Sequence, residues 1–251
     1  MYKDITYRFP GFERFITFGT YIPRKHGLND NLSESLLDFK NEDEHTIQKW
    51  AAYVKSLVVT SNHLQIKGGG NYVRALGHNQ LRSSTGDSLG RFEKLLGKTS
   101  VSNFLSKTRT TGSLKSLGRI QRAEELNDVY LFSKTTDSKL NNAEINFIIF
   151  DDIVTTGTTI KAIAVAIKKS FPNAKLYGFS LLGTDDPDSE TSSDNNGVYN
   201  RIFNQSTNPS HHDEDEFLTS DETMDEYMRY SRGDNNSDDD DDDDDDDDLP
   251  F

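Results

Sequence analysis

The sequence predicts an α/β fold with a mostly parallel central sheet flanked by helices, and one stretch of the chain carries most of this prediction. Residues 147–150 form an unbroken apolar run, Phe-Ile-Ile-Phe, which is typical of a strand buried on both faces of a parallel sheet. From Ile160 to Ile167 the apolar residues switch to helical spacing, with lysines outside the apolar face. A further apolar run at 176–182 predicts the next strand, so strand, helix and strand follow one another.

The composition excludes several classes of protein. The chain has 251 residues and no cysteine, which excludes disulfides and a thiolate zinc site, and we expect no zinc. No apolar stretch reaches membrane-spanning length, and the first residues lack the apolar core of a signal peptide. The sequence therefore predicts a cytoplasmic protein with no membrane partner.

The net charge of −14 divides unevenly along the chain. Residues 1–183 hold 25 Lys and Arg against 17 Asp and Glu, a net charge of +8. Residues 184–251 hold 3 against 25, a net charge of −22. A basic body with an acidic tail indicates binding to polyanions or to partners that bind polyanions.

Two carboxylates and a threonine-rich turn link the strand to the helix. The residues are Asp151, Asp152, Thr155, Thr156, Gly157, Thr158 and Thr159. A loop that ends at a helix N-terminus presents unpaired N–H groups and favours a phosphate. Adjacent carboxylates can accept hydrogen bonds from a ribose diol, directly or through Mg²⁺, which prefers carboxylate and phosphate oxygens. The loop thus suits a sugar phosphate; the alternative is a plain helix cap, which needs only one such residue.

Other elements are expected in chain order. Residues 1–30 alternate aromatic and polar residues and predict short strands or an extended arm. Residues 36–40 predict a short strand, and apolar residues at three- and four-residue spacing predict a helix over 43–58. Trp50 lies on the apolar face of that helix and is expected in the core.

A glycine run separates this helix from the following elements. Lys67, Gly68, Gly69 and Gly70 cannot lie inside a strand or helix without a large entropic cost. They form either a nest of N–H groups for an anion or a plain flexible turn. Four segments are then expected: residues 72–81 leading into a helix with Leu89 and Phe92 on its apolar side, a strand at 101–105, a mobile basic loop at 106–125 and a strand at 129–132.

The stretch FIIFDDIVTTGTTI resembles the phosphoribosyl-pyrophosphate (PRPP) loop of type I phosphoribosyltransferases. The resemblance implies a type I phosphoribosyltransferase-like fold that binds PRPP with Mg²⁺. It implies that Asp151 and Asp152 hold the ribose and the metal, while Thr155 to Thr159 hold the 5′-phosphate. It places the pyrophosphate at Lys67 to Gly70. Arg109 and Arg122, from the basic loop, would close over the leaving pyrophosphate, and both acids and both arginines are the catalytic candidates.

A wider resemblance, from about residue 36 to 183, is to the ComF family, which is linked to DNA uptake in competent bacteria. It depends on three blocks, the last being the acid-pair loop. The matching residues before that loop are Arg74, Gly77, Asn79 and Gln80, then Arg109, Thr110, Leu117, Arg122, Asn127 and Phe132. The chain departs from the family by lacking its four-cysteine zinc ribbon. It also has Lys67 to Gly70 near the family's usual Pro-Val-Pro segment.

The acidic C-terminal segment has an unusual end. Residues 184–237 are poor in apolar residues and predict a disordered linker, and residues 238–248 are eleven consecutive aspartates. Leu249, Pro250 and Phe251 follow, and this ending resembles the C-terminal tip of bacterial single-stranded DNA-binding proteins. In that family the tip docks on genome-maintenance proteins, so the resemblance implies such partners. The alternative is an inert, solvated tail.

The sequence therefore predicts an arm at 1–30, a phosphoribosyltransferase-like domain at 31–183, a linker at 184–237 and an acidic tail with its tip at 238–251. We expect a ComF-like protein that binds PRPP and Mg²⁺ and acts in DNA uptake, recombination or other DNA metabolism, recruited through its tip. One alternative is a non-enzymatic accessory module for single-stranded DNA or recombination proteins. A weaker alternative is a nucleotide-salvage phosphoribosyltransferase.

Overall fold

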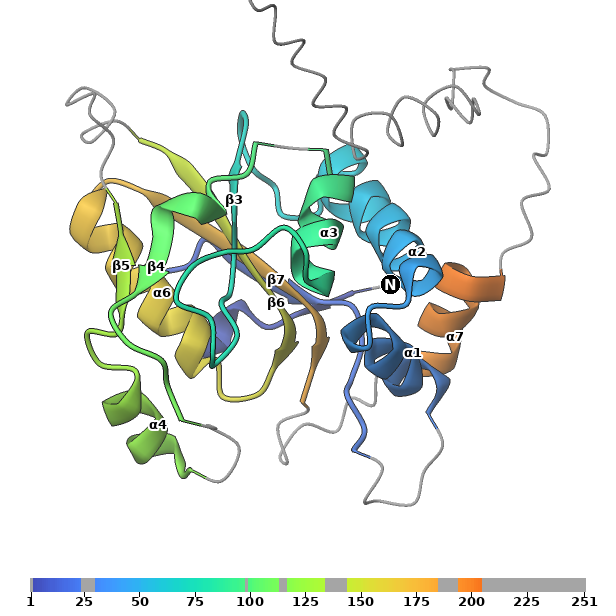
Figure 1. Ribbon diagram of the computed structural model, residues 1–251. Coiled ribbons are helices and arrows are strands. Elements are labelled where there is room, and N and C mark those ends of the chain that lie inside the picture. The colour runs from blue at the N-terminus through green and yellow to red at the C-terminus, as the bar shows by residue number, and fades with distance from the viewer. Residues whose placement is uncertain are drawn as a thin grey trace, which may run out of the picture. The chain divides into compact units, whose positions relative to one another are not determined.

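The computed structural model describes residues 2–23, 30–97, 99–112, 117–133, 144–184 and 194–204 (Figure 1). The predicted aspartate tail and its Leu249-Pro250-Phe251 tip lie outside the described residues, as does most of the predicted linker.

The centre of the fold is a five-stranded sheet with the order β1-β2-β7-β6-β3. The strands are β1 (Lys3–Asp4), β2 (Arg14–Thr17), β3 (Asn71–Arg74), β6 (Asn146–Val154) and β7 (Lys175–Gly183). β2, β7, β6 and β3 run parallel, and only the short β1 is antiparallel. The predicted α/β class with a mostly parallel sheet is confirmed, and β6 and β7 lie where the two apolar runs predicted strands.

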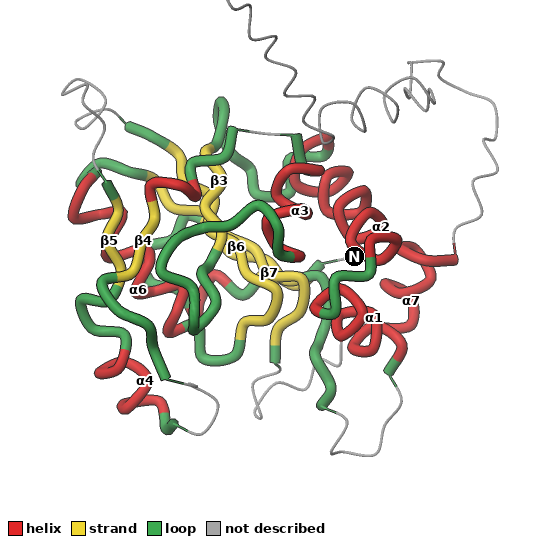
Figure 2. Tube along the Cα trace, viewed as in Figure 1, coloured by secondary structure: helices red, strands yellow, loops and turns green. Residues whose placement is uncertain are grey.

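Helices cover both faces of this sheet (Figures 1 and 2). On one face lie α6 (Thr158–Ser170) and a separate antiparallel pair, β4 (Leu105–Lys107) and β5 (Tyr130–Phe132). On the other face lie α1 (Asn31–Lys40), α2 (Glu44–Val54) and α3 (Ser88–Leu95). Each face has its own apolar cluster, which is why β6 and β7 are apolar on both sides.

The predicted strand at 36–40 is wrong, because these residues form the second half of α1. Leu32, Leu36 and Phe39 recur at helical spacing and are fully buried. Asp30 caps the helix by accepting a hydrogen bond from Ser33 N at 2.8 Å. The predicted helix over 43–58 is confirmed as α2, which continues into a π-helical segment at Lys55–Thr60, and Trp50 is buried in the core.

The N-terminal segment does form short strands, but it is not a separate arm. β2 pairs with β7 along its whole length, and Phe9 and Phe15 are buried. Their rings stack at 4.0 Å between centroids. Residues 2–23 therefore share the sheet and core of the segment that the sequence predicted to begin at residue 31.

Two loop predictions also need correction. The predicted mobile loop at 106–125 contains most of β4 and all of α4 (Arg119–Glu125), and the expected strand at 101–105 begins only at Leu105. Within the predicted linker, α7 (Asn195–Tyr199) and a following π-helical segment (Asn200–Asn204) pack on α1 and α2.

The reason for the second correction is a short apolar stripe. Val198 and Ile202, four residues apart, are buried, and the rings of Tyr199 and Phe203 stack at 4.8 Å. Asn195 Nδ2 donates hydrogen bonds to Thr20 O and to an Asp30 carboxylate oxygen. None of the helices in the described ranges has the length and apolar character needed to cross a membrane.

Candidate functional site

The candidate site lies where the parallel strands β3, β6 and β7 end. Asp151 on β6 is in register with Ser180 on β7, and Ala75, just after β3, donates its backbone N–H to Phe150 O at 2.9 Å. The carboxyl ends of neighbouring parallel strands form one edge of the sheet, which is where open α/β sheets bind ligands. The acid pair and the segment after β3 therefore meet at this edge.

The two acids of the pair belong to opposite faces of the sheet, because successive residues of a strand alternate. Phe150 and Asp152 belong to the α1 side, where Lys40 Nζ lies 2.8 Å from Asp152 Oδ2. Ile149 and Asp151 belong to the α6 side. The acid pair therefore places one carboxylate toward the α1 side of the sheet and the other toward the α6 side.

Burial controls the electrostatics of the pair. Burial raises the pKa of Asp151 well above its ordinary value, and the neighbouring Asp152 carboxylate raises it further. Burial alone would lower the pKa of Lys40, but the ion pair and hydrogen bond with Asp152 outweigh it, so this pKa is raised. Lys40 is therefore held as an ammonium beside Asp152.

The threonine-rich turn has the geometry of an anion site at a helix N-terminus. Gly157 precedes α6 with φ +71°, a left-handed conformation that L side chains rarely adopt. A Cβ at this position would lie 2.4 Å from the ring of Phe9. The hydroxyls of Thr156 and Thr158 lie 2.8 Å apart, and the first-turn N–H groups of α6 have no partner within the helix. The sequence-based prediction of strand, loop and helix is confirmed in this region.

Two arginines from distant parts of the chain contact the turn. Arg8 donates from Nη1 to Thr184 O at 3.0 Å and from Nη2 to Thr155 O. Arg122 on α4 donates from Nε to Leu117 O at 2.8 Å, and its Nη1 lies 3.5 Å from Thr155 Oγ1. The sequence did not predict Arg8 at the turn, because this contact forms only when the N-terminal segment folds onto the sheet.

A cavity of about 560 Å³, here called the loop cavity, lies over the turn. It is lined by Tyr21, Pro23, Leu37, Lys40, Arg122, Thr184 and residues 151–160. It therefore brings together both acids, the whole turn from Thr155 to Thr159 and one of the two predicted arginines.

A second cavity of about 380 Å³, here called the lysine cavity, lies on the other side of the acid pair. It is lined by Lys40, Ala75, Leu76, Gly77, His78, Leu89, Lys107, Thr111, Leu126, Tyr130, Asp151, Asp152 and Thr159. The two cavities share Lys40, Asp151, Asp152 and Thr159. A ligand held by the acid pair can therefore extend into both.

Lys107 is the most unusual side chain of the lysine cavity. It is 6% exposed, donates from Nζ to Gly77 O at 2.8 Å and lies 5.3 Å from the ring centroid of Tyr130. Burial lowers its pKa to about 8, although Asp151 opposes this shift. Sequence reasoning missed Lys107 and Lys40, because one lies in a polar stretch and the other ends an element predicted as a strand.

Arg109, the other predicted arginine, lines neither cavity. Its Nη1 lies 2.7 Å from Glu125 Oε1, and its Nη2 donates to Glu125 O at 2.7 Å. Arg109 thereby ties the segment after β4 to the end of α4, and the structure does not bring it to the acid pair.

The structure places Lys67 to Gly70 at the opposite edge of the sheet from the acid pair. These residues precede β3, and Asn146 at the start of β6 donates from Nδ2 to Lys67 O and Gly69 O, both at 3.0 Å. Asn146 and Asp151 are five residues apart on one strand, so about 16 Å separates the two positions. Because β3 and β6 are parallel, the segment that adjoins the acid pair is the one after β3, residues 75–78.

Residues 74–80, RALGHNQ, shape this adjoining segment. Arg74 is almost fully buried and donates to the Asp87 carboxylate and to Ser84 O, while its Nε lies 3.8 Å from Glu93 Oε2. Gln80 Oε1 accepts a hydrogen bond from Gly77 N at 2.8 Å. Arg74 and Gln80 do not line the lysine cavity themselves, but they fix residues 75–78, which do.

The side chains of the acid pair are of the kind that Mg²⁺ prefers, carboxylate oxygens. In the described parts of the chain, no three metal-binding side chains gather into a group. The two carboxylates would serve as protein ligands, and Mg²⁺ usually completes its shell with substrate phosphates and waters. The metal is thus expected as part of the ligand complex.

Comparison with known proteins gives no assignment beyond this geometry. No protein-family model matches the chain, and a search of curated proteins found no match.

Proposed function

We propose that the chain is a ComF-like protein of the type I phosphoribosyltransferase fold and that it binds PRPP as its Mg²⁺ complex. The observation that carries this proposal is the meeting of two cavities at one acid pair. One of these cavities also reaches the N-terminus of α6. PRPP has a phosphate at one end of the pentose, a diol beside the anomeric carbon and a pyrophosphate on that carbon, so it needs such a divided site.

Each part of the ligand has a counterpart in the site. The 5′-phosphate would accept hydrogen bonds from the first-turn N–H groups of α6 and from the hydroxyls of Thr155 to Thr159. The diol would donate to Asp151 and Asp152. The remaining phosphates would extend toward Lys40 and Lys107, whose side chains supply positive charge in the lysine cavity.

Transfer of the phosphoribosyl group passes through an oxocarbenium-like state, so positioning and charge neutralisation supply most of the catalysis. The carboxylates of Asp151 and Asp152 would stabilise positive charge on the pentose. Lys40 would neutralise negative charge on the departing pyrophosphate. Arg122 lines the loop cavity beside Thr155 and would face the 5′-phosphate.

Thermal denaturation with added PRPP and MgCl₂ tests the proposal. Binding to the folded state alone stabilises it by about 2.7 kcal/mol at a ligand concentration one hundred times Kd. We expect this stabilisation in the wild-type chain and in Asp38→Asn, an exposed α1 residue that lines neither cavity. We expect none in Asp151→Asn with Asp152→Asn, and equal stabilisation of this variant would refute the proposal.

We also propose that the acidic tail recruits the protein to DNA metabolism. The observations are the charge division, +8 over residues 1–183 and −22 over 184–251, and the Leu249-Pro250-Phe251 ending. The side chains of Leu249 and Phe251 can fill an apolar pocket, and the aspartates speed encounter with a basic rim. Deleting residues 249–251 should abolish capture of a purified protein that binds the tips of single-stranded DNA-binding proteins, and persistent capture would refute this role.

A second candidate function is a non-enzymatic accessory module for single-stranded DNA. The basic body favours it, since phosphate neutralisation dominates nucleic-acid affinity and makes it salt-dependent. The two candidates differ in one measurement. If the wild-type chain binds a single-stranded oligonucleotide with a steep salt dependence but gives no stabilisation with PRPP, the accessory role is favoured.

A further inference from the structure

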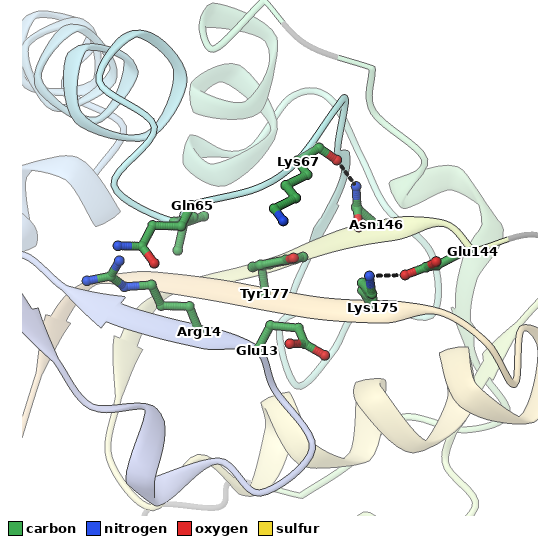
Figure 3. Close-up of a pocket in the computed structure, with 9 residues that line it drawn as sticks. Glu13, Arg14, Gln65, Lys67, Glu144, Asn146, Lys175 and Tyr177 are labelled. Atoms are coloured by element: carbon green, nitrogen blue, oxygen red, sulfur yellow. Dashed lines mark hydrogen bonds and ion pairs between the residues drawn. The ribbon is translucent and has the colours of Figure 1, made fainter.

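A third cavity, here called the edge cavity, lies at the amino ends of the parallel strands, away from the acid pair. Its volume is about 480 Å³, within the usual range for small-molecule sites. It is lined by Glu13, Arg14, Leu64, Gln65, Lys67, Glu144, Asn146, Lys175 and Tyr177 (Figure 3). Almost all of these side chains are polar or charged, which suits a polar ligand.

Several of its charges are already balanced. Lys175 pairs with Glu144, as Figure 3 shows, and Arg14 pairs with Asp4 at 3.1 Å. Lys67 has no ion-pair partner within the described ranges, and its side chain reaches toward Tyr177 on β7 (Figure 3). Among the described lining residues, the Lys67 ammonium and the Glu13 carboxylate are the two charges outside these ion pairs.

The loop that carries Lys67 is fixed in place and left open. Asn146 holds the carbonyls of Lys67 and Gly69, as described above. Gly68 has φ +85°, and a Cβ at either Gly68 or Gly69 would meet no atom within 4 Å. A Cβ at Gly70 would lie 2.6 Å from Ile148, so this glycine is needed for packing. The backbone beside Lys67 can therefore approach a ligand closely without an intervening side chain.

A residue beside this loop has a rare backbone conformation and lines the cavity. Gln65 has φ +56°, which is rare for such a residue, whereas Asn62 has φ +46°, a conformation that Asn adopts more readily. The Asn62 side chain braces the turn by accepting from Ile66 N at 2.9 Å and donating to Ile66 O at 3.0 Å. Figure 3 shows the Gln65 amide beside the Arg14 guanidinium. Strain of this kind concentrates at ligand sites.

The opposite wall supplies hydrogen-bond acceptors. Glu13 immediately precedes β2, and its carboxylate interacts electrostatically with Tyr177. Burial, with a smaller effect of Glu13, raises the pKa of the Tyr177 hydroxyl. A carboxylate on one wall and an ammonium on the other impose a direction on the ligand, with its anion at Lys67 and its hydroxyls at Glu13.

We propose that the edge cavity is a second ligand site, for a small phosphorylated molecule that carries free hydroxyls. Lys67 binds the phosphate, while Glu13 and Gln65 bind the hydroxyls, and all three line the cavity. This site does not depend on the proposed PRPP function, because it shares no residue with the loop cavity or the lysine cavity.

The test is an NMR titration of the ¹⁵N-labelled full chain with ribose 5-phosphate, and with inorganic phosphate and ribose as comparison probes. We expect saturable shifts of the Gly68 and Gly69 amides and of the Asn146 side-chain amide with ribose 5-phosphate. Phosphate alone should bind more weakly, and ribose alone should give no saturable shift. A titration in which only the Thr155 to Thr159 amides shift, or in which phosphate binds as tightly as ribose 5-phosphate, overturns the inference.

Variants separate this site from the first one. Lys67→Ala should raise Kd at this edge at least about tenfold, while the matched exposed lysine variant Lys55→Ala should leave it unchanged. Gln65→Gly removes the side chain and relieves the strain, and it should also weaken binding. Asp151→Asn with Asp152→Asn should affect only shifts near Thr158.

The two proposals can be refuted separately. Unchanged binding in Lys67→Ala overturns the edge site and leaves the PRPP proposal standing. Edge shifts that persist while PRPP fails to bind overturn the proposed function and support the edge site.

Discussion

Lys40 Nζ lies 2.8 Å from Asp152 Oδ2, at the place where the loop cavity and the lysine cavity meet. This ion pair joins α1 to the end of β6, two elements more than one hundred residues apart in the sequence. The two carboxylates face the amines of Lys40 and Lys107. A Mg²⁺ ion bound to the ligand phosphates would add positive charge beside them. The pair is thus the electrostatic centre of the proposed site.

Replacing Lys40 should shift the pH dependence of ligand binding. Lys40 lowers the pKa of Asp151, so Lys40→Ala should let that carboxyl stay protonated up to a higher pH. A protonated Asp151 is a poorer partner for the diol and the metal. The pH at which half of the PRPP affinity is lost should therefore move upward, as measured by ligand-induced thermal stabilisation between pH 5.5 and 8. Lys40→Arg keeps the charge, so its midpoint pH should shift less than that of Lys40→Ala. A midpoint pH in Lys40→Ala identical to that of the wild type would contradict this role of Lys40.

Gly157→Ala should disturb both the stability of the fold and the turn. An L residue in the left-handed region costs roughly 1–2 kcal/mol, and the new Cβ would also press on the buried ring of Phe9. We expect urea denaturation to show a loss of at least about 1 kcal/mol, with PRPP binding lost as well. Gly112→Ala is the control, since its Cβ would meet nothing within 4 Å and its φ is not left-handed. Equal stability changes in the two variants would contradict the assigned strain.

Lys107→Met should remove a pH dependence of stability. Because burial lowers the pKa of Lys107 from 10.5 to about 8, the unfolded chain binds more protons than the folded chain between these values. The free energy of unfolding should therefore gain a contribution from this group as pH rises above about 8, with a slope of at most about 1.4 kcal/mol per pH unit.

Urea denaturation from pH 7.5 to 9.5 measures this effect. The wild-type chain and the exposed control Lys55→Met should share the rise, and Lys107→Met should lack it. A rise of the same size in Lys107→Met would show that its amine is not the group responsible.

Arg74→Met should be far more costly than the loss of a surface arginine. Arg74 is 1% exposed, and removal of its guanidinium leaves Asp87 and the buried Glu93 without their cation. Breaking such a pair costs about 3–5 kcal/mol. Arg91→Met breaks exposed pairs with glutamates and should cost less than about 1 kcal/mol.

Chemical denaturation separates the two arginine variants. Adding Glu93→Gln to Arg74→Met should recover part of the loss, because it removes the unpaired charge. No recovery, or equal losses in Arg74→Met and Arg91→Met, would contradict the assignment of Arg74 to a buried charge network.

Local patterns predicted the centre of the fold and much of the site. β6, the acid pair, the turn at 155–159 and α6 follow one another in the chain, so apolar runs, helical spacing and one glycine were enough to locate them. α2, β5 and β7 were predicted for the same reason. α1 was missed because its apolar spacing begins at Leu32, and only its second half was considered.

The rest of the site depends on strand pairing, which local patterns do not determine. Whether the glycine run or residues 75–78 adjoin the acids is decided by the parallel pairing of β3 with β6, between segments more than seventy residues apart. Lys40 and Lys107 reach the acids from opposite faces of the sheet for the same reason. Residues 195–204 were assigned to a linker because four apolar residues among many polar ones gave only a weak pattern.

Calorimetric titration of the full chain with PRPP and MgCl₂ tests the central claim most directly, that one acid pair and one helix N-terminus hold a pentose by its diol and its phosphate. The account predicts a saturable, one-to-one heat in the wild-type chain. It predicts no heat for Asp151→Asn with Asp152→Asn, provided that this variant unfolds in urea at no lower concentration than the wild type. Absence of heat in the wild-type chain, or the same heat in the folded variant, would contradict it.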